Sequence, residues 1–184
     1  MLQKIVSIFF TLFAFIQSSC SQGSTANRLG HCQSPRFDRE VGMWLSFKVP
    51  AIDVDSLRNA PSNVFILDAR EPSEYAVSHI PGAIQGGFDH FDLQQLDTLD
   101  KNRPVVVYCS IGYRSEKIAN QLKKAGFTQV SNLYGSIFEW ANRGYPLENA
   151  VGEPTLQIHT FNRMWGRWVT NDAYQKVTSY QEKK

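Results

Sequence analysis

Val105-Val106-Val107-Tyr108-Cys109-Ser110-Ile111-Gly112-Tyr113-Arg114-Ser115 is the stretch that decides the fold of this chain. It opens with three β-branched residues and a tyrosine, a continuous apolar run typical of a strand buried on both faces of a parallel sheet. Residues with helical spacing follow Ser115 and stop at Gly126. The stretch therefore predicts a strand, a short loop that begins at Cys109, and a helix.

Other segments repeat this alternation of strand and helix. Val64-Phe65-Ile66-Leu67 is a second continuous apolar run and therefore another central strand. A short helix is expected to begin at Pro72, and residues 130–133 form a last strand before a helix that starts at Ser136. Residues 52–54 are a candidate edge strand. Strands separated by helices predict an α/β fold with a central parallel sheet flanked by helices.

Cys109 is the candidate nucleophile. In open α/β sheets, ligands bind beyond the carboxyl ends of the strands, where free N–H groups and the helix dipole favour negative charge. A cysteine in that place should have a lowered pKa and react as a thiolate. Four residues separate Cys109 from Arg114, so the loop should curl around one anion with the guanidinium closing it. The alternative is a buried cysteine that only packs, but Gly112, Arg114 and the helix start favour a functional one.

The composition restricts the class of protein. The chain has 184 residues and a net charge of +2 with both signs mixed, so it suits one ordinary core with appendages and offers no basic surface for nucleic acid. Three cysteines are an odd number and too few for a disulfide framework. The four histidines and three cysteines lack metal-ligand spacing, so no metal site is expected.

The first residues predict export. An apolar run from Ile5 to Ile16 follows the single charge of Lys4 and is too short to span a bilayer comfortably. Small residues then lead to Cys20, so residues 1–19 are interpreted as a signal peptide. A mature chain that begins at Cys20 resembles a bacterial lipoprotein, lipid-anchored on the periplasmic side of a membrane, with residues 20–47 as tether and N-terminal extension. Gln17 departs from the usual lipoprotein pattern, and the alternatives are cleavage near Ser19 without a lipid and an uncleaved membrane anchor.

Residues 48–149 resemble a rhodanese domain. The matching motifs are Leu67-Asp68-Ala69-Arg70-Glu71, Glu74-Tyr75, His79-Ile80-Pro81-Gly82-Ala83, the loop from Cys109 to Arg114, and Leu133-Tyr134-Gly135-Ser136-Ile137-Phe138-Glu139-Trp140. Two residues depart from the family pattern. Ser136 replaces a more usual glycine, which is expected to affect only a turn, and Ser110 replaces a frequently basic residue, which leaves Arg114 as the charged group of the loop.

The resemblance implies a sulfurtransferase without metal or organic cofactor. Cys109 would accept a sulfane sulfur as a persulfide from thiosulfate or a persulfide donor and pass it to a thiol or cyanide. Arg114 would assist, and the loop would hold the anion through the backbone N–H groups of Ser110, Ile111, Gly112, Tyr113 and Ser115. Asp68 and Arg70, at the end of a neighbouring strand, are expected to support the loop, with Arg70 pairing with Glu71 or Glu74.

Two other classes of function compete with sulfur transfer. Phosphatases and arsenate reductases of the same fold need one more residue between the cysteine and the arginine, so the short loop counts against them. A non-catalytic rhodanese-like module that binds a partner or senses thiol redox state is the second alternative. The intact cysteine loop argues against it.

Two features lie outside the resemblance. Cys32 either remains unpaired in the N-terminal extension or pairs with Cys109 under oxidation, and the unpaired state is favoured. The tail from residue 150 to 184 is too apolar for a linker, with Phe161, Met164, Trp165 and Trp168. It is expected to cover part of the domain together with residues 43–45, and a partner-binding surface is the alternative.

Overall fold

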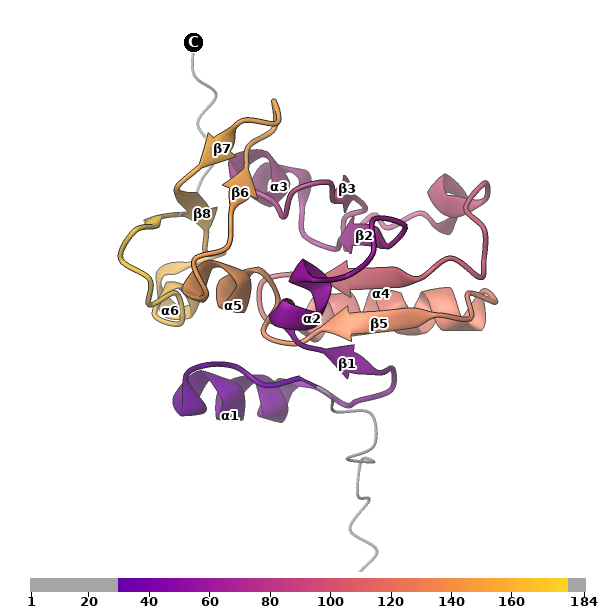
Figure 1. Cartoon of the computed structure of the whole chain (residues 1–184), viewed down its shortest axis with the longest axis horizontal. Coiled ribbons are helices and arrows are strands. Elements are labelled where there is room, and N and C mark those ends of the chain that lie inside the picture. Colours follow the sequence, from indigo (N-terminus) through magenta and orange to yellow (C-terminus); the bar gives the residue numbers. More distant parts are fainter. Residues whose placement is uncertain (1–29, 179–184) are drawn as a thin grey trace, which may run out of the picture.

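A five-stranded parallel sheet forms the centre of the computed structural model, which describes residues 30–178 (Figure 1). The strand order is β1-β5-β4-β2-β3, and every neighbouring pair is parallel. The strands are β1 (Ala51–Ile52), β2 (Phe65–Asp68), β3 (Ile84–Gln85), β4 (Val105–Tyr108) and β5 (Val130–Leu133). The expected signal peptide, Cys20 and the first part of the tether lie outside the described residues.

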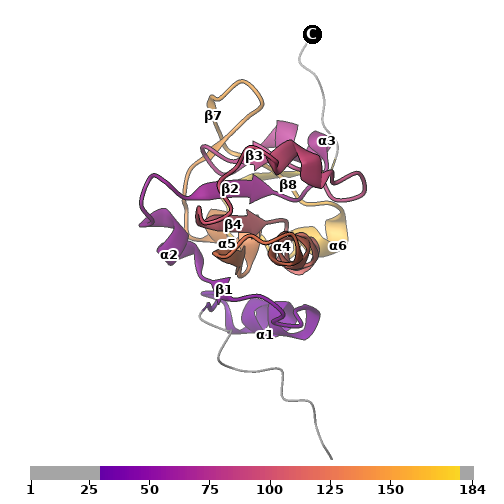
Figure 2. The ribbon, with the colours of Figure 1, turned by 90° about the vertical axis from the view of Figure 1, so that its right-hand side faces the viewer.

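Helices cover both faces of this sheet. They are α1 (Pro35–Trp44), α2 (Val54–Arg58), α3 (Pro72–Val77), α4 (Tyr113–Lys124), α5 (Ser136–Asn142) and α6 (Arg163–Gly166), with a short 3₁₀ helix, η2 (Leu93–Leu96). Figure 2 shows α4 on one side of the sheet, α2 on the other, and α1 at the β1 edge. The α/β fold with a central parallel sheet is confirmed.

Strand β4 contributes to a separate core on each face, as its continuous apolar sequence predicts. Val105 and Val107 lie in a cluster with Ile118 of α4, while Val106 and Tyr108 lie in a second cluster that includes residues of α1, α2 and α5. Successive side chains of a strand point to opposite faces, so four apolar residues in a row fit only a strand covered on both sides. This covered strand ends at Tyr108, one residue before Cys109.

Strand β2 lies one residue later than the expected run Val64–Leu67, and two further element boundaries differ from the sequence-based expectation. Helix α4 begins at Tyr113 rather than Ser115, because Gly112 takes a left-handed conformation (φ 119°) and serves as the N-cap. The candidate edge strand ends at Ile52. The carboxylate of Asp53 accepts the Ser56 N–H at 2.7 Å, so Val54 belongs to helix α2.

The N-terminal extension is bound to the sheet domain by specific hydrogen bonds. The buried carboxylate of Glu116 accepts the N–H groups of Ser46 and Lys48, each at 2.8 Å. The Tyr134 hydroxyl donates to the Asp38 carbonyl of α1 at 2.9 Å. These contacts place the end of α1 next to the first turn of α4.

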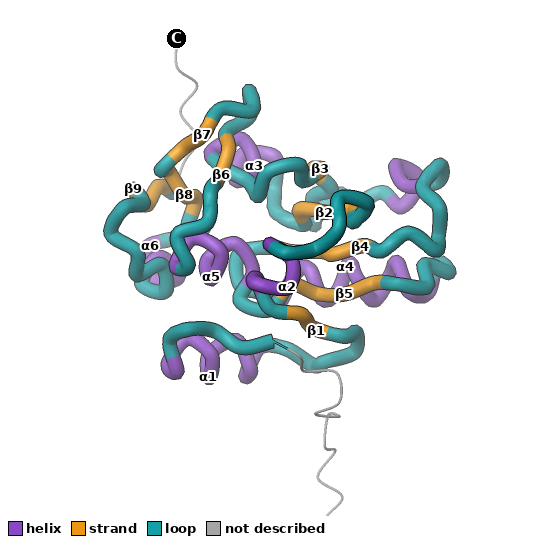
Figure 3. The backbone as a smooth tube through the Cα atoms, in the orientation of Figure 1, coloured by secondary structure: helices purple, strands orange, loops and turns teal. Residues whose placement is uncertain are grey.

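The C-terminal extension packs on the same domain. Its first strand, β7 (Pro154–Thr155), pairs antiparallel with β6 (Leu147–Glu148) at the end of the domain, and β8 (Gln157–His159) pairs parallel with β9 (Gln175–Val177) (Figure 3). Ile158 and Val169 are fully buried in the core, and the Trp168 ring stacks on Phe37 of α1 with centroids 5.5 Å apart. The two extensions therefore contact one another as well as the domain. Between residues 30 and 178, no helix has the length and apolar character needed to cross a bilayer.

Candidate active site

Cys109 lies directly after β4, in the loop that enters α4. Its side chain is buried, with 1% of its surface exposed, and its sulfur accepts the Gly112 N–H at 3.2 Å. The left-handed conformation of Gly112 then directs the chain into α4. The sulfur therefore sits at the amino end of a helix, where partial positive charge stabilises a thiolate.

The first residues of helix α5 form hydrogen bonds with the backbone of the loop. The Cys109 N–H donates to Ser136 Oγ at 3.2 Å, and the Ser136 hydroxyl donates to the Leu133 carbonyl at 2.9 Å. The N–H groups of Ile137 and Phe138 donate to the carbonyls of Cys109 and Ser110, each at 3.2 Å. The expectation that Ser136 affects only a turn is wrong, because its hydroxyl also holds the backbone of the cysteine.

Asn132 of β5 fixes the other side of the loop, a contact that the sequence did not reveal. Ser115 Oγ donates to Asn132 Oδ1 at 2.7 Å, and Asn132 Nδ2 donates to the Gly112 carbonyl at 3.0 Å. The partners are 17 and 20 residues apart in the chain. A buried asparagine within an expected strand is the one signal that could have indicated this role.

The pKa of Cys109 is lowered. Burial raises it, but the charge of Arg114 and hydrogen bonds from Ser115 and the Gly112 N–H lower it by more. The thiolate is the form of cysteine that attacks sulfur. The site therefore favours the reactive form.

We expect this shift to appear in a titration of the thiolate by its ultraviolet absorbance in a Cys20→Ser/Cys32→Ser background, where Cys109 is the one remaining thiol. A group with a lowered pKa stays ionised as the pH falls below the usual value of about 8.5. The midpoint should therefore lie below that value, and Arg114→Gln should raise it. A midpoint above the usual value would show that burial outweighs the positive charge.

Arg114 forms an ion pair with Glu74 across the loop. Its two terminal nitrogens bind the Glu74 carboxylate at 2.6 and 2.9 Å, and Nη2 also donates to Ser110 Oγ at 3.1 Å. Burial raises the pKa of Glu74, but its contacts with His159 and Arg114 and the charge of Arg114 hold it well below its usual range. The pair is ionised at neutral pH, so much of the positive charge in the loop is already compensated.

Asp68 and Arg70 form a second pair that is wholly enclosed. Both side chains are 0% exposed, and Arg70 Nη2 binds Asp68 Oδ2 and the Ser78 carbonyl, each at 2.6 Å. The expectation that Arg70 pairs with Glu71 or Glu74 is wrong. Arg70 forms its ion pair with Asp68, and Glu74 forms its ion pair with Arg114.

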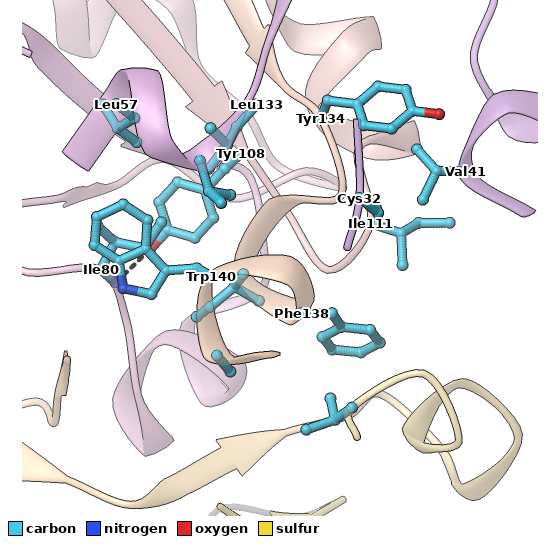
Figure 4. Close-up of a cluster of buried hydrophobic side chains, with 14 of the residues drawn as sticks. Cys32, Val41, Leu57, Ile80, Tyr108, Ile111, Leu133, Tyr134, Phe138 and Trp140 are labelled. Carbon is cyan, nitrogen blue, oxygen red and sulfur yellow. Dashed lines mark hydrogen bonds between the residues drawn. The ribbon is translucent and has the colours of Figure 1, made fainter. Parts of the chain in front are cut away.

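The remaining loop residues differ in exposure. Ser110 and Ile111 are buried, whereas Tyr113 is 37% exposed. Cys32 and Cys109 are both thiols and lie in different core clusters. Figure 4 shows Cys32 near Val41 and Ile111. No group of metal-ligating side chains occurs within residues 30–178.

The sequence profile of the rhodanese-like domain matches residues 51–143, half of the chain. The chain belongs to the rhodanese-like family. A protein named sulfurtransferase from Allochromatium vinosum is 35% identical over 102 residues, which cover 54% of this chain and 94% of that protein. The rhodanese-like domain of an Anabaena protein, solved by NMR, superposes with a TM-score of 0.51 and 29% identity, covering 58% of this chain and 83% of that one.

Other relatives share only part of their length with this rhodanese-like chain. The tRNA uridine(34) hydroxylase of Aster yellows witches'-broom phytoplasma is 41% identical over 83 residues, which cover 42% of this chain but 27% of the hydroxylase. The chain thus spans less than a third of that relative. Residues 30–50 and 144–178 lie outside the matched family region.

Proposed function

We propose that this protein is a sulfurtransferase that carries a sulfane sulfur as a persulfide on Cys109. The proposal depends on the position of Cys109 at the start of α4. Its sulfur accepts the Gly112 N–H at 3.2 Å, and the pKa of its thiol is lowered. Membership of the rhodanese-like family and similarity to a protein named sulfurtransferase support it. No hydroxylase activity is proposed, because the chain spans under a third of the similar hydroxylase.

The reaction has two displacement steps. The Cys109 thiolate attacks the outer sulfur of a persulfide, RS–SH, whose S–S bond breaks and releases RS⁻. With thiosulfate as donor, the leaving group is sulfite. In the second step an acceptor thiolate or cyanide attacks the outer sulfur of the Cys109 persulfide, and Cys109 leaves as thiolate. Sulfur is transferred without an external oxidant or reductant.

The loop geometry favours a donor with little negative charge. A persulfide on Cys109 would lie among loop N–H groups such as that of Gly112, which stabilise an anion without a formal charge. Arg114, the cation of the loop, is paired with Glu74 at 2.6 Å. We therefore propose that organic persulfides load Cys109 faster than the dianion thiosulfate does.

Export is the second part of the proposal. A signal peptide at residues 1–19 and a lipid on Cys20 would hold the domain at the periplasmic side of a bacterial membrane. The mass of the mature N-terminal peptide, isolated from membranes, tests for the lipid.

Sulfur loading tests the proposal directly. We expect the intact protein, incubated with an organic persulfide or thiosulfate and freed of small molecules, to gain the mass of one sulfur atom. Cyanide should then remove that mass and yield one equivalent of thiocyanate. A protein that never gains sulfur from either donor would instead fit the non-catalytic binding module.

A further inference from the structure

Five exposed apolar side chains lie on α1, at the start of α4, and in or just before α6, the elements next to the catalytic loop. We name them the rim: Met43, Trp44, Tyr113, Phe161 and Met164, with exposed fractions of 69, 42, 37, 54 and 59%. They are five of the eight large exposed hydrophobic residues within positions 30–178. A cluster of this kind marks an interaction surface more often than scattered apolar residues do.

Direct contacts join the rim to the active site. Trp44 meets the edge of Tyr113, the residue after Gly112, with ring centroids 5.5 Å apart, and it meets Trp165 of α6 at the same distance. The Arg114 guanidinium lies 5.6 Å from the centroid of the Phe161 ring. In Figure 1, β4 and β5 point toward the side of the molecule where α6 lies. Rim residues from the two extensions thus border the loop that carries Cys109.

Phe161 is held in a strained conformation without being buried. Its φ of 63° lies in the left-handed region, which bulky residues rarely adopt, although 54% of its surface is exposed. Its N–H donates to His159 Nδ1 at 3.2 Å, and that nitrogen lies 3.7 Å from Glu74 Oε1. Strain of this kind occurs preferentially at functional sites. The chain therefore presents Phe161 at the surface through contacts with the catalytic ion pair.

Positive charge borders the rim. Lys117 Nζ lies 4.2 Å from the centroid of the Tyr113 ring. A hollow of about 310 Å³ is lined by residues of α6, of β9 and next to them: Thr160, Arg163, Gly166, Arg167, Lys176 and Thr178. In the sequence, Phe161 follows Thr160 and Met164 follows Arg163. Trp44 Nε1 donates to the Glu40 carboxylate at 3.0 Å. Lys117 beside Tyr113, and Arg163 next to Met164 in α6, favour an acidic partner.

We propose that the rim docks an acidic, apolar polypeptide segment that bears a cysteine, and that this cysteine is the sulfur acceptor. The inference rests on the proposed sulfur transfer. Aromatic residues, methionine and arginine are the types enriched in protein interfaces. A bilayer lying on the rim would cover the loop around Cys109, which must both receive and deliver sulfur. A polypeptide can place its thiol at the loop while its neighbouring residues occupy the rim.

The chemistry of this transfer is balanced. The partner thiolate attacks the outer sulfur of the Cys109 persulfide, which projects about 2 Å beyond Sγ. The S–S bond breaks, Cys109 leaves as thiolate, and the partner cysteine becomes the persulfide. Docking raises the local concentration of the partner thiol and leaves the reaction with a small acceptor unchanged.

Single-turnover transfer from the persulfide-loaded, full-length protein tests the proposal. The acceptors are a peptide with one cysteine among Asp, Glu, Leu and Phe, the same peptide with Lys in place of each acid, and cyanide, with peptide rates expressed per thiolate. We expect the acidic peptide to react about tenfold faster than the basic one. Trp44→Ala/Met164→Ala should remove about tenfold of the acidic-peptide rate and leave the cyanide rate unchanged.

Leu156→Ala/Val151→Ala is the matched control, because these residues are 61 and 76% exposed and lie outside the rim. This control should react as the wild type does with all three acceptors. Equal rates for the two peptides, or an equal loss of peptide and cyanide rates in the rim variant, would overturn the docking role. Rim-dependent binding to anionic phospholipid vesicles that blocks transfer would assign the rim to a membrane and also overturn it. Failure of sulfur loading itself would overturn the proposed function instead.

Discussion

Cys109→Ser is expected to abolish sulfur loading from both organic persulfide and thiosulfate. A serine hydroxyl occupies nearly the same space, but it is not ionised near neutral pH and does not attack sulfur as a thiolate does. The bonds of the loop backbone to Ser136, Ile137 and Phe138 do not involve the sulfur, so the loop should keep its shape. Intact mass after incubation with each donor measures the loss, which should be complete.

Cys32→Ser is the matched control for this loss. Cys32 is also buried, with 5% of its surface exposed, but it lies in the core cluster on the other side of β4. This variant should load one sulfur, and peptide mapping should place that sulfur on the peptide that contains Cys109. Loading of Cys109→Ser at another cysteine would contradict the assignment of Cys109 as the carrier.

The order of elements around the site follows from local sequence. Four consecutive apolar residues before Cys109 can be covered on both sides only in a central strand, and Gly112 next to a helical pattern indicates the turn. These features determine the conformation of neighbouring residues, so they predicted β4, the loop and α4 to within two residues of the observed helix start. The parallel sheet followed from the alternation of the expected strands with helices.

The long-range partners could not be predicted in this way. Glu74 and Arg114 are 40 residues apart, and Cys109 and Ser136 are 27 apart. Arg70 has three carboxylates within four residues of it in the chain, and only the folded backbone selects Asp68. The periodicity of a helix or strand indicates which of its faces is buried. It does not indicate which side chain of another element contacts that face.

The contacts of the two extensions with the site could not be predicted for the same reason. The Phe161 ring contacts the guanidinium of Arg114, which lies 47 residues earlier in the chain. Trp44 contacts Tyr113, which lies 69 residues later. The sequence indicated that both extensions are too apolar to be linkers, which predicted packing or partner binding. The structure shows that Trp168 packs on Phe37 while Phe161 and Met164 remain exposed. One segment thus combines a packed face with an exposed one.

The second large effect is expected for Asp68→Asn, which should lower the free energy of unfolding by about 3–5 kcal/mol. Asp68 and Arg70 are both 0% exposed, and Asp68 accepts Arg70 Nε and Nη2 at 3.0 and 2.6 Å. The substitution leaves the Arg70 charge buried without a counter-charge, and such a charge has no access to water for solvation. Urea unfolding followed by circular dichroism measures the change in the free energy of unfolding. On heating, the Tm should fall by roughly 10 °C for a chain of this size.

Two further variants distinguish the buried charge from a general loss of a carboxylate. Asp89→Asn removes an exposed carboxylate and should leave the unfolding midpoint within about 0.5 kcal/mol of the wild type. Asp68→Asn/Arg70→Met removes both charges, so it should be more stable than Asp68→Asn alone, because no unpaired ion remains in the core. If the double variant were the less stable of the two, the stabilising role would belong to the bond from Arg70 to the Ser78 carbonyl rather than to charge compensation.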